Sequence, residues 1–365
     1  MLDRLRPVAF LALACLACTG ATVAGDLVAD LGLKPDAGPV RERPGWHAPR
    51  LVLLSDEFAP QLAEFSALAP GARFVLQAAA TPGEVETADV VILPCQEEAL
   101  LRQARGLEWL QVTAAGVDRC AANDALRARA PLITNMQRVM GPAIAEHALA
   151  LMFALSRHFD WHQQHQHAHE WANGAADLPE AQELEGRTLL VVGLGGIGTE
   201  LARRAHALGM HVIATRSGGH EGPDFVEHVG TPDELLALAS QADYVANCLP
   251  LTSATTGLFD RRFFAAMRAG AYFISVGRGR STVTDELVAA IRSHHLAGAG
   301  LDVTDPEPLP ANHPLWTLPG VIITPHVAAV SPGSVELRLA LLRENLRRYV
   351  AGEAMLSVVD AGRGY

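Results

Sequence analysis

The chain has 365 residues, of which 49% are hydrophobic and 19% are charged, and its formal net charge is -11. This composition is that of a globular protein long enough for two domains, and it excludes a disordered or fibrous chain. The acidic balance, without a long basic run, argues against nucleic acid or an anionic membrane surface as a main partner.

The first 25 residues have the layout of a secretory signal. Arg4 and Arg6 precede an apolar run over 7–18, and small residues follow. A basic start, a short apolar core and a small-residue cleavage zone are typical of export leaders. We predict a signal-like leader over 1–25 and an extension or linker over 26–48. The alternatives are a start codon placed too far upstream and a loosely packed N-terminal extension.

The five cysteines fall into two groups. Cys15 and Cys18 lie in the apolar leader, whereas Cys95, Cys120 and Cys248 are scattered through the body of the chain. Scattered cysteines without a regular spacing do not indicate a disulfide framework. We therefore predict that the three cysteines of the body are ordinary buried thiols.

Apolar strands alternate with helical segments after residue 49. The expected strands are at 50–55, 74–76, 90–93, 110–112 and 132–135, and the first helix is expected at 60–68. Such alternation indicates a parallel sheet covered by helices on both faces. Ligands of these sheets gather at the carboxyl ends of strands, so the turn at Ala115 and Gly116 is a candidate edge of a binding site.

A long helix is expected from about residue 142, and a segment rich in His and Trp follows it over 158–172. Histidine-rich runs can bind metal, but no acidic or thiol partner stands at ligand spacing in this one. We predict no metal site. We interpret the segment as a helical surface beside a cleft or as a contact between two copies of the chain.

The stretch between 188 and 208 is the most informative part of the sequence. A strand over 188–192 leads into Gly193, Gly195 and Gly198, and a helical pattern follows. In this setting the first glycine permits a tight turn, the second lets a pyrophosphate approach the backbone, and the third allows close packing of helix on strand. Free N–H groups at the helix start then receive the phosphates. The pattern predicts a dinucleotide site; the alternative is a glycine-rich turn without a ligand.

The end of the next strand, 210–215, indicates which dinucleotide is expected. An NAD-type site carries Asp or Glu near this point to bind the ribose 2′-hydroxyl. This chain has Arg216 and Ser217 instead. A guanidinium can clamp a 2′-phosphate and a hydroxyl can add a hydrogen bond, so the sequence favours NADP, with NAD possible. The alternative is an ordinary exposed arginine.

Four further apolar strands end in polar residues: 242–248, 270–276, 299–303 and 321–326. Three of the side chains that follow such strands could work together. Arg278 lies between two glycines and suits a two-point grip on a carboxylate, whereas His326 can exchange a proton near neutral pH. Glu307 could hold the His326 ring and favour its charged form. For each residue alone, a surface ion pair or a loop anchor is the alternative.

With these motifs in place, the chain resembles the D-isomer-specific 2-hydroxyacid dehydrogenases, and within them the glyoxylate/hydroxypyruvate reductase group. The resemblance covers roughly residues 50–355. It rests on ordered matches at 193–198, 249–252, 276–279, 300–303, 307–309, 313–316 and 324–329. The resemblance implies that Arg278 binds the substrate carboxylate and carbonyl, and that Glu307 is the partner of the acid/base. It further implies that His326 donates the proton.

The resemblance also implies a cofactor site and a substrate turn. Backbone N–H groups of Ala115 and Gly116 are expected to bind the substrate, and Asp302 is expected to lie against the nicotinamide. The expected cofactor-binding residues are Gly193, Gly195, Gly196, Ile197, Gly198, Arg216, Ser217, Leu249, Pro250, Thr255, Val276, Gly277 and Asp302. Gly277 is a mild departure, because family members commonly have Ala there. Arg216 stands where NAD-using members have Asp, and NADP-using members share this replacement.

The expected fold is α/β, with two doubly wound parallel-sheet domains. A Rossmann NAD(P)-binding domain over 146–334 is inserted in a flavodoxin-like substrate domain made of 49–145 and 335–365. The helix from 334 to 350 is expected to cross back to the first domain. Because family members are usually homodimers, a homodimer is expected.

The sequence thus predicts an NADP-preferring oxidoreductase that reduces small 2-oxo acids to D-2-hydroxy acids. Two alternatives stay open: an NAD-dependent dehydrogenase of another D-2-hydroxy acid, and a catalytically idle NAD(P)-sensing interaction protein. The compartment is open as well. The leader indicates export to the periplasm, whereas a soluble nicotinamide cofactor indicates the cytoplasm if the leader is a start-site artefact.

Overall fold

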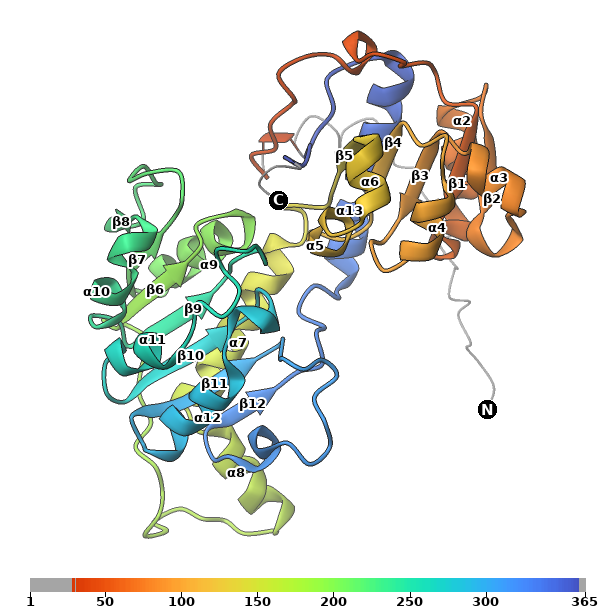
Figure 1. Ribbon diagram of the computed structural model, residues 1–365. Coiled ribbons are helices and arrows are strands. Elements are labelled where there is room, and N and C mark those ends of the chain that lie inside the picture. Colours follow the sequence, from red (N-terminus) through yellow and green to blue (C-terminus); the bar gives the residue numbers. More distant parts are fainter. Residues whose placement is uncertain (1–27, 30, 361–365) are drawn as a thin grey trace, which may run out of the picture.

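The structure, a computed structural model, describes residues 28–29 and 31–360. The signal-like leader over 1–25 therefore lies outside the described residues. Two parallel sheets, each covered by helices, are joined by two long helices (Figure 1). This arrangement confirms the expected fold class of two doubly wound parallel-sheet domains. No helix within the described ranges is long and apolar enough to cross a membrane.

The first sheet has five parallel strands in the order β2-β1-β3-β4-β5. The strands are β1 (Leu51–Leu54), β2 (Arg73–Leu76), β3 (Val90–Leu93), β4 (Trp109–Val112) and β5 (Leu132–Thr134). The helices of this sheet are α2 (Leu62–Leu68), α3 (Pro82–Thr87), α4 (Glu98–Gln103), α5 (Asp118–Ala121) and α6 (Asp124–Arg129). Strands β3 and β4 are buried along their whole length, as expected for central parallel strands. The one polar residue among them, Gln111, accepts hydrogen bonds from Thr134 and Asn345.

The second sheet has seven parallel strands in the order β12-β11-β10-β9-β6-β7-β8. The strands are β6 (Thr188–Val192), β7 (His211–Thr215), β8 (His228–Gly230), β9 (Tyr244–Asn247), β10 (Ala271–Ser275), β11 (Leu296–Leu301) and β12 (Val321–Ile323). Its helices are α9 (Gly196–Ala207), α10 (Leu235–Ala239), α11 (Arg261–Ala266) and α12 (Thr284–Arg292). Strands β7 and β8 follow β6 on one side of the sheet, and the chain then returns to place β9 on the other side of β6. Sheets of this kind bind ligands at such a switch of strand order, beyond the carboxyl ends of the strands.

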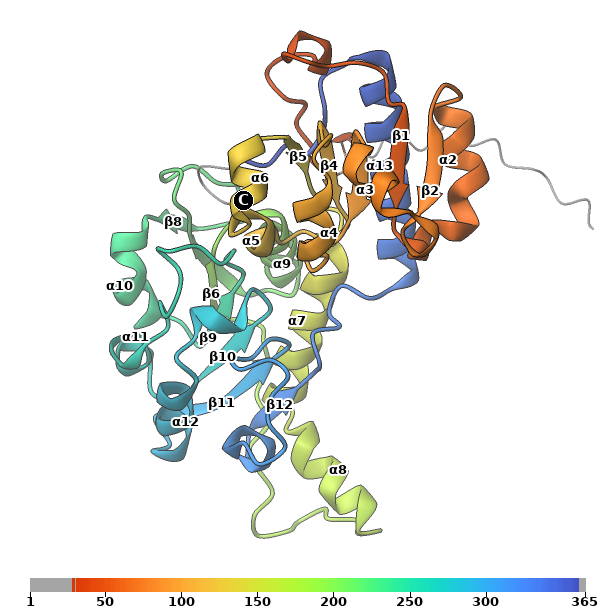
Figure 2. The ribbon, with the colours of Figure 1, turned by 45° about the vertical axis from the view of Figure 1, so that its right-hand side comes forward.

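Two long helices connect the sheets. Helix α7 (Gly141–Ser156) packs on α9 and on strands β10 to β12, and α13 (Pro332–Ala351) packs on α2 of the first sheet. Both helices run between the two units in both views of the ribbon (Figures 1 and 2). The domain limits drawn from the sequence at 145/146 and 334/335 fall inside these two helices.

Short 3₁₀ helices complete the chain: η1 (Val40–Glu42), η2 (Asp56–Gln61), η3 (Gln77–Ala79), η4 (Pro232–Glu234), η5 (Gly279–Ser281) and η6 (Pro314–Thr317). One of them corrects a predicted helix. Where 60–68 was expected to be one helix, η2 runs to Gln61 before α2 begins, and Pro60 lies inside it. The helix itself is present, and its start is shifted by two residues from the expected one.

The segment before the first strand is packed against the end of the chain. The backbone N–H of Asp36 donates to the Met355 carbonyl at 2.8 Å, and that of Val40 donates to the Glu353 carbonyl at 3.0 Å. The side chain of Val40 is buried in the core of the first sheet. The described part of the segment over 26–48 therefore belongs to the substrate-domain core.

The His- and Trp-rich segment forms α8 (Phe159–His167), which lies at the far end of the second unit from the first sheet (Figure 2). None of the side chains of α8 is buried. Within the described residues, no group of three or more His, Cys, Asp or Glu side chains could hold a metal ion. The segment therefore presents an exposed helical surface.

The prediction that the three body cysteines are ordinary thiols is wrong for two of them. Cys95 and Cys120 form a disulfide, with their Cα atoms 5.1 Å apart, whereas Cys248 is free and buried. Cys95 follows β3 and Cys120 lies on α5, which follows β4. Because β3 and β4 are adjacent parallel strands, the loops at their carboxyl ends lie side by side, a proximity that cysteine spacing in the sequence does not reveal.

Candidate active site

The glycine turn after β6 has the geometry that a dinucleotide site requires. Gly193 has φ +99°, a conformation that L side chains rarely adopt. A Cβ at Gly198 would overlap the Gly193 carbonyl oxygen and lie 2.8 Å from Cγ1 of Val191, so only glycine lets α9 pack this closely on the strand. A Cβ at Gly195, in contrast, would meet no atom within 4 Å. The open space lies at the N-terminus of α9, where phosphates bind in such folds.

The start of α9 is also pressed against the start of α7. A Cβ at Gly141 would lie 2.9 Å from the Gly196 carbonyl oxygen, and one at Gly196 would lie 2.9 Å from Cα of Arg138. Ile197 packs on the core between these helices. The end of the turn where phosphates are expected is therefore fixed by α7 as well as by its own strand.

Arg216 stands at the end of β7, as the sequence indicates. Its Nη1 donates to the Glu221 carbonyl at 2.8 Å and its backbone N–H donates to Gly230 at 3.0 Å. Ser217 is the next residue, so neither of the two residues that follow β7 is acidic. The guanidinium is held beside the end of the strand, where the ribose of a bound dinucleotide is expected.

The loop after β9 lies beside the glycine turn, because a Cβ at Gly193 would lie 2.9 Å from Cδ2 of Leu249. Thr255 Oγ1 donates to the Pro250 carbonyl at 2.7 Å, which folds this loop back on itself. The Leu249 N–H donates to Oδ1 of Asn247 at 3.1 Å. The predicted residues Leu249, Pro250 and Thr255 thus belong to one braced loop.

Asn247 is a structural residue of the site that the sequence analysis did not single out. It is fully buried, and its Nδ2 donates to the hydroxyls of Ser275 at 3.0 Å and Ser281 at 2.8 Å. Ser281 in turn donates to the Arg278 carbonyl at 2.6 Å. One amide therefore ties together the ends of β9, β10 and the arginine turn. The available signal was an Asn closing an otherwise apolar strand.

Arg278 is flanked by glycines because its turn crosses two other segments at close range. A Cβ at Gly277 would lie 2.6 Å from the Leu249 carbonyl oxygen, and one at Gly279 would overlap the carbonyl of Thr304. Val276, just before this turn, is buried and donates its N–H to Asn247 at 3.1 Å. The glycine at 277, where family members commonly have Ala, therefore fits the close backbone crossing of this chain.

The guanidinium of Arg278 reaches across to the loop after β4. Its Nη1 donates to the Gly277 carbonyl at 2.9 Å, and its Nε donates to Oδ1 of Asp118 at 3.2 Å. A Cβ at Gly116 would overlap Nη2 of Arg278 and lie 2.6 Å from its Cζ. The structure thus brings together two predicted substrate groups, the turn at 115–116 and Arg278, which come from different sheets.

The turn at Ala115 and Gly116 is held by its carbonyls. The Met136 N–H donates to the Ala114 carbonyl at 3.0 Å, and Nδ2 of Asn135 donates to the Ala115 carbonyl at 2.7 Å. Within the described part of the chain, the N–H groups of Ala115 and Gly116 donate to no protein acceptor. They are therefore available for an anionic or carbonyl oxygen.

His326 and Glu307 form the second pair. Nδ1 of His326 lies 2.7 Å from Oε1 of Glu307, and the two side chains are 47% and 43% exposed. With an Nδ1 proton donated to the carboxylate, Nε2 is the ring nitrogen left for a substrate. Among the described residues no direct contact joins this pair to Arg278, so the structure presents an arginine–glycine group and a histidine–glutamate group.

Asp302 braces the turn that carries His326. Its side chain is only 3% exposed. It accepts hydrogen bonds from Thr324 Oγ1 at 2.7 Å, from the Val327 N–H at 2.9 Å and from the Ala328 N–H at 3.1 Å. His326 itself has φ +56°, an uncommon conformation for a residue other than glycine, which the surrounding contacts must hold.

His147 extends this network into α7. Its Nε2 lies 2.8 Å from Thr324 Oγ1. Because that hydroxyl gives its proton to Asp302, it must accept from an Nε2 proton of His147. The sequence analysis did not identify His147 or Thr324, since neither belongs to a recognised catalytic spacing. Their role follows from a contact between residues 177 positions apart.

The model of the D-isomer specific 2-hydroxyacid dehydrogenase, NAD binding domain, matches residues 149–328. A glyoxylate/hydroxypyruvate reductase A from Serratia proteamaculans is 30% identical over 289 residues, covering 78% of this chain and 90% of the relative.

Solved structures agree with this match. A D-isomer specific 2-hydroxyacid dehydrogenase family protein from Aeromonas salmonicida is similar with a TM-score of 0.74 and 30% identity, over 86% of this chain and 100% of its own. An NADPH-dependent glyoxylate/hydroxypyruvate reductase from Sinorhizobium meliloti, solved with NADP and sulfate, is similar with a TM-score of 0.73 and 26% identity. The match covers 87% of this chain and 100% of that chain.

The glycine turn and the switch of strand order define a Rossmann-type dinucleotide-binding fold. More narrowly, the chain belongs to the D-isomer-specific 2-hydroxyacid dehydrogenases, a family of NAD(P)-dependent enzymes. The resemblance noted in the sequence is therefore confirmed.

Proposed function

We propose that the protein is an NADP-preferring reductase of small 2-oxo acids, of the glyoxylate or hydroxypyruvate type. The observation that carries this proposal is the guanidinium of Arg278 lying directly on the Gly116 turn, whose N–H groups are available to a ligand. A 2-oxo acid offers a carboxylate and an adjacent carbonyl, which match a forked donor and two backbone N–H groups.

Arg278 binds and orients the substrate. Its Nε is engaged by Asp118 and one Nη1 proton by the Gly277 carbonyl, so the remaining donors of the fork are left for the substrate carboxylate. The N–H groups of Ala115 and Gly116 hold the oxygen atoms from the opposite side. Fixing both ends of a small acid places its carbonyl carbon in one orientation, which is the main contribution of such clamps to rate.

His326 supplies the proton. In its charged form it keeps Nδ1–H on Glu307 and presents Nε2–H to the carbonyl oxygen of the substrate, where negative charge develops. The carboxylate of Glu307 orients the ring by accepting from Nδ1. Asp302 holds the His326 turn in place through the Val327 and Ala328 N–H groups.

The residues around the glycine turn fit a phosphorylated dinucleotide. The space beyond Gly195 and the N-terminus of α9 would hold the pyrophosphate, and Arg216 with Ser217 would hold a 2′-phosphate. The chemistry that the reduced cofactor supplies when bound is the hydride that reaches the carbonyl carbon. The NADP in the Sinorhizobium meliloti structure supports the preference proposed here.

The decisive experiment is a substrate panel. Loss of NADPH absorbance is followed with glyoxylate, hydroxypyruvate and larger 2-oxo acids, and the best substrate is repeated with NADH. The proposal expects turnover of at least one small acid and a higher kcat/KM with NADPH. Turnover of larger acids alone, or a preference for NADH, would favour an NAD-dependent dehydrogenase of another acid. Cofactor binding without any turnover would favour a sensor protein.

We also propose a homodimer, as the family resemblance implies. The His-rich helix and the loop after it expose Phe159, Trp171 and Leu178, a surface that a second copy would cover. Light scattering coupled to size exclusion measures the mass directly. A monomeric wild-type protein would contradict the proposal, and Trp171→Asp is expected to weaken the dimer.

The compartment is proposed from two observations, the leader over 1–25 and the Cys95–Cys120 disulfide. Disulfides persist in oxidising compartments and are rare in the cytosol, so the bond supports export to the periplasm. Cells that express the full chain are fractionated and the N-terminus of the recovered protein is determined by mass spectrometry. An intact leader on a cytosolic protein would contradict export.

A further inference from the structure

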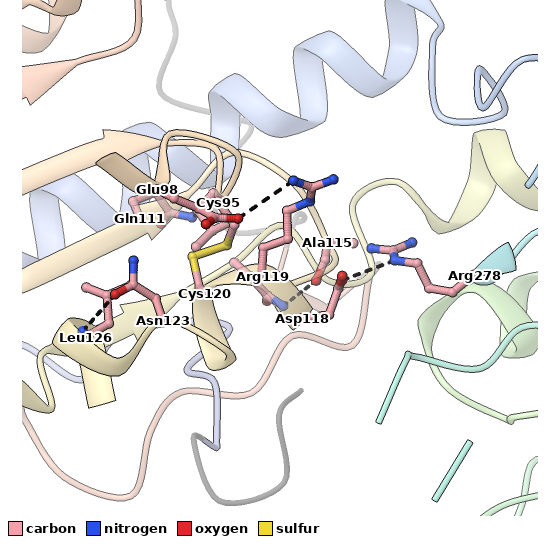
Figure 3. Close-up of a disulfide and its surroundings, with 12 residues drawn as sticks. Cys95, Glu98, Gln111, Ala115, Asp118, Arg119, Cys120, Asn123, Leu126 and Arg278 are labelled. Atoms are coloured by element: carbon pink, nitrogen blue, oxygen red, sulfur yellow. Dashed lines mark hydrogen bonds and ion pairs between the residues drawn. A yellow bond between two sulfur atoms is a disulfide. The ribbon is translucent and has the colours of Figure 1, made fainter. Parts of the chain in front are cut away.

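Two features of the loop after β4 are not explained by the proposed chemistry alone. One is the Cys95–Cys120 disulfide, and the other is the ion pair between Asp118 and Arg278 (Figure 3). Asp118 and Cys120 are two residues apart on the same short helix, α5. The substrate-binding arginine is therefore linked, through one carboxylate and one helix, to a covalent bond in the other unit.

Helix α5 has only four residues, so its own hydrogen bonds cannot hold it in place. The bond from the buried Cys120 to Cys95, which is buried in the turn after β3, ties α5 covalently to the sheet. The buried side chain of Val117 and the exposed ion pair between Arg119 and Glu98 are further contacts of this segment. Residues at i and i+2 of a helix do not face the same side. Accordingly Cys120 points back toward the sheet while Asp118 points toward Arg278 (Figure 3).

The contact with Asp118 determines how the guanidinium is turned. Asp118 takes the Nε donor at 3.2 Å, and both side chains are partly buried, at 27% exposed for the arginine and 30% for the aspartate. Gly116 lies under Nη2 and the Gly277 carbonyl takes Nη1. These three contacts fix the plane of a rigid fork, which leaves its free edge for a carboxylate.

We propose that Asp118 is a positioning residue for Arg278, and that the Cys95–Cys120 disulfide holds Asp118 where it performs this role. The inference rests on the proposed function, because it assigns Arg278 to the substrate carboxylate. It extends that function by making the affinity for a 2-oxo acid depend on the oxidation state of two cysteines outside the substrate and cofactor contacts. Asp118 itself does not touch the reacting atoms.

The direction in which the KM changes when Asp118 is removed distinguishes a positioning role from a purely electrostatic one. If Asp118 acted only as a negative charge near an anionic substrate, its removal would lower the KM by Coulomb's law. A positioning role predicts the opposite. Loss of a charge-assisted hydrogen bond in a partly buried site should raise the KM about tenfold to thirtyfold in Asp118→Ala. Asp118→Asn retains an acceptor oxygen and should raise it less.

The control is Asp124, the first residue of the next helix, which pairs with the exposed Arg127 of its own helix. Asp124→Ala removes the same charge from the same unit without a contact to Arg278, and its KM should stay within twofold of the wild-type value. The dissociation constant for NADPH should be unchanged in both alanine variants. Most of the change in Asp118→Ala should lie in KM, since the proton donor is untouched.

A second readout needs no turnover. Phenylglyoxal modifies accessible arginines, and peptide mass spectrometry gives the rate for Arg278 alone. Release from Asp118 should raise this rate at least threefold in Asp118→Ala and leave it unchanged in Asp124→Ala. If the wild-type protein reduces no oxo acid, the proposed function fails, yet this labelling rate still tests the contact. If the wild type is active and neither KM nor labelling changes, the positioning role fails.

The disulfide is tested in the same assays. A peptide map without reductant should show the Cys95 and Cys120 peptides joined. Dithiothreitol delivers two electrons and two protons to the two sulfurs, giving two thiols and the cyclic disulfide of the reagent. Reduced wild type and Cys95→Ser/Cys120→Ser should both show a KM raised about threefold or more, because α5 loses its covalent tether to the turn after β3. An unchanged KM in both would overturn the role of the disulfide.

A double-mutant comparison tests whether the Cys95–Cys120 disulfide changes the KM through Asp118. If the disulfide acts through Asp118, reduction should change the KM of Asp118→Ala by less than twofold, because the contact is already lost. Equal fold-changes from reduction in wild type and in Asp118→Ala would show that the two act independently, and would overturn the link. Free thiols at both positions in protein isolated without reductant would overturn it as well. Reduced wild type keeps the test available if the serine variant does not fold.

Discussion

Replacing Gly116 by alanine puts a methyl carbon where the Arg278 guanidinium now lies. The new Cβ would be 2.6 Å from Cζ and would overlap Nη2, whereas ordinary contacts between carbon atoms begin at about 3.5 Å. The guanidinium must therefore retreat by more than about 1 Å, because Nη2 overlaps the new carbon more closely than Cζ does. Arg278 can move because it is the far end of a flexible side chain, so the fold should survive while the clamp is displaced.

The expected loss is large because clamps are sensitive to position. A misplacement of about 1 Å can cost on the order of 10² in rate, so kcat/KM for the 2-oxo acid should fall about a hundredfold. Affinity for NADPH should not change, since Gly116 belongs to the first sheet and the glycine turn to the second. The assay is NADPH absorbance loss with the best acid of the panel, with cofactor affinity measured by fluorescence.

A matched control separates this effect from the general cost of a methyl group. A Cβ at Gly83, in α3 of the same unit, would meet no atom within 4 Å. Gly83→Ala should therefore keep both its kcat/KM and its melting temperature close to the wild-type values. If Gly116→Ala retained kcat/KM within threefold of wild type, the reasoning that Arg278 on this turn binds the substrate would be refuted.

Three further predictions concern the other groups of the site. His326→Ala should lose about 10² to 10⁴ in turnover while NADPH still binds; full turnover would remove His326 from the role of proton donor. Arg216→Asp should shift the preference from NADPH toward NADH in kcat/KM, because a carboxylate repels a 2′-phosphate and accepts from a ribose hydroxyl. Burial raises the pKa of the Cys248 thiol to about 12, so below that pH the thiol stays protonated and is a poor nucleophile. Iodoacetamide at pH 8 should label Cys248 only after unfolding, and labelling of the native protein would contradict its burial.

Local patterns in the sequence predicted the elements that depend on neighbouring residues. The roles of Gly193, Gly195 and Gly198 follow from a strand, a turn and a helix within eleven residues, and the structure gives each glycine the space expected for its role. The pairing of Glu307 with His326 was also expected, from the family motif. In both cases the chemistry of one short segment, or one known motif, was sufficient.

Contacts between segments that are far apart along the chain could not be predicted from the sequence. Asn247 joins three loops through hydroxyls 28 and 34 residues away, and His147 meets Thr324 across 177 residues. The disulfide joins the ends of adjacent strands, and its two cysteines carry no recognisable spacing. Such contacts follow from strand order, which a single sequence does not specify.

Helix α7 fixes the distance between two loops of the proposed site, which neither loop could fix alone. Gly141 at its start lies against the helix at which we propose that the pyrophosphate binds. His147, six residues later, contacts the turn that carries His326, the proposed proton donor. Six residues of α-helix advance about 9 Å along a stiff axis. The spacing between the proposed pyrophosphate site and the proposed proton donor is thus set by one helix. Insertion or deletion of a single residue between these two points would rotate one contact off the helix face by about 100° and uncouple cofactor placement from proton delivery.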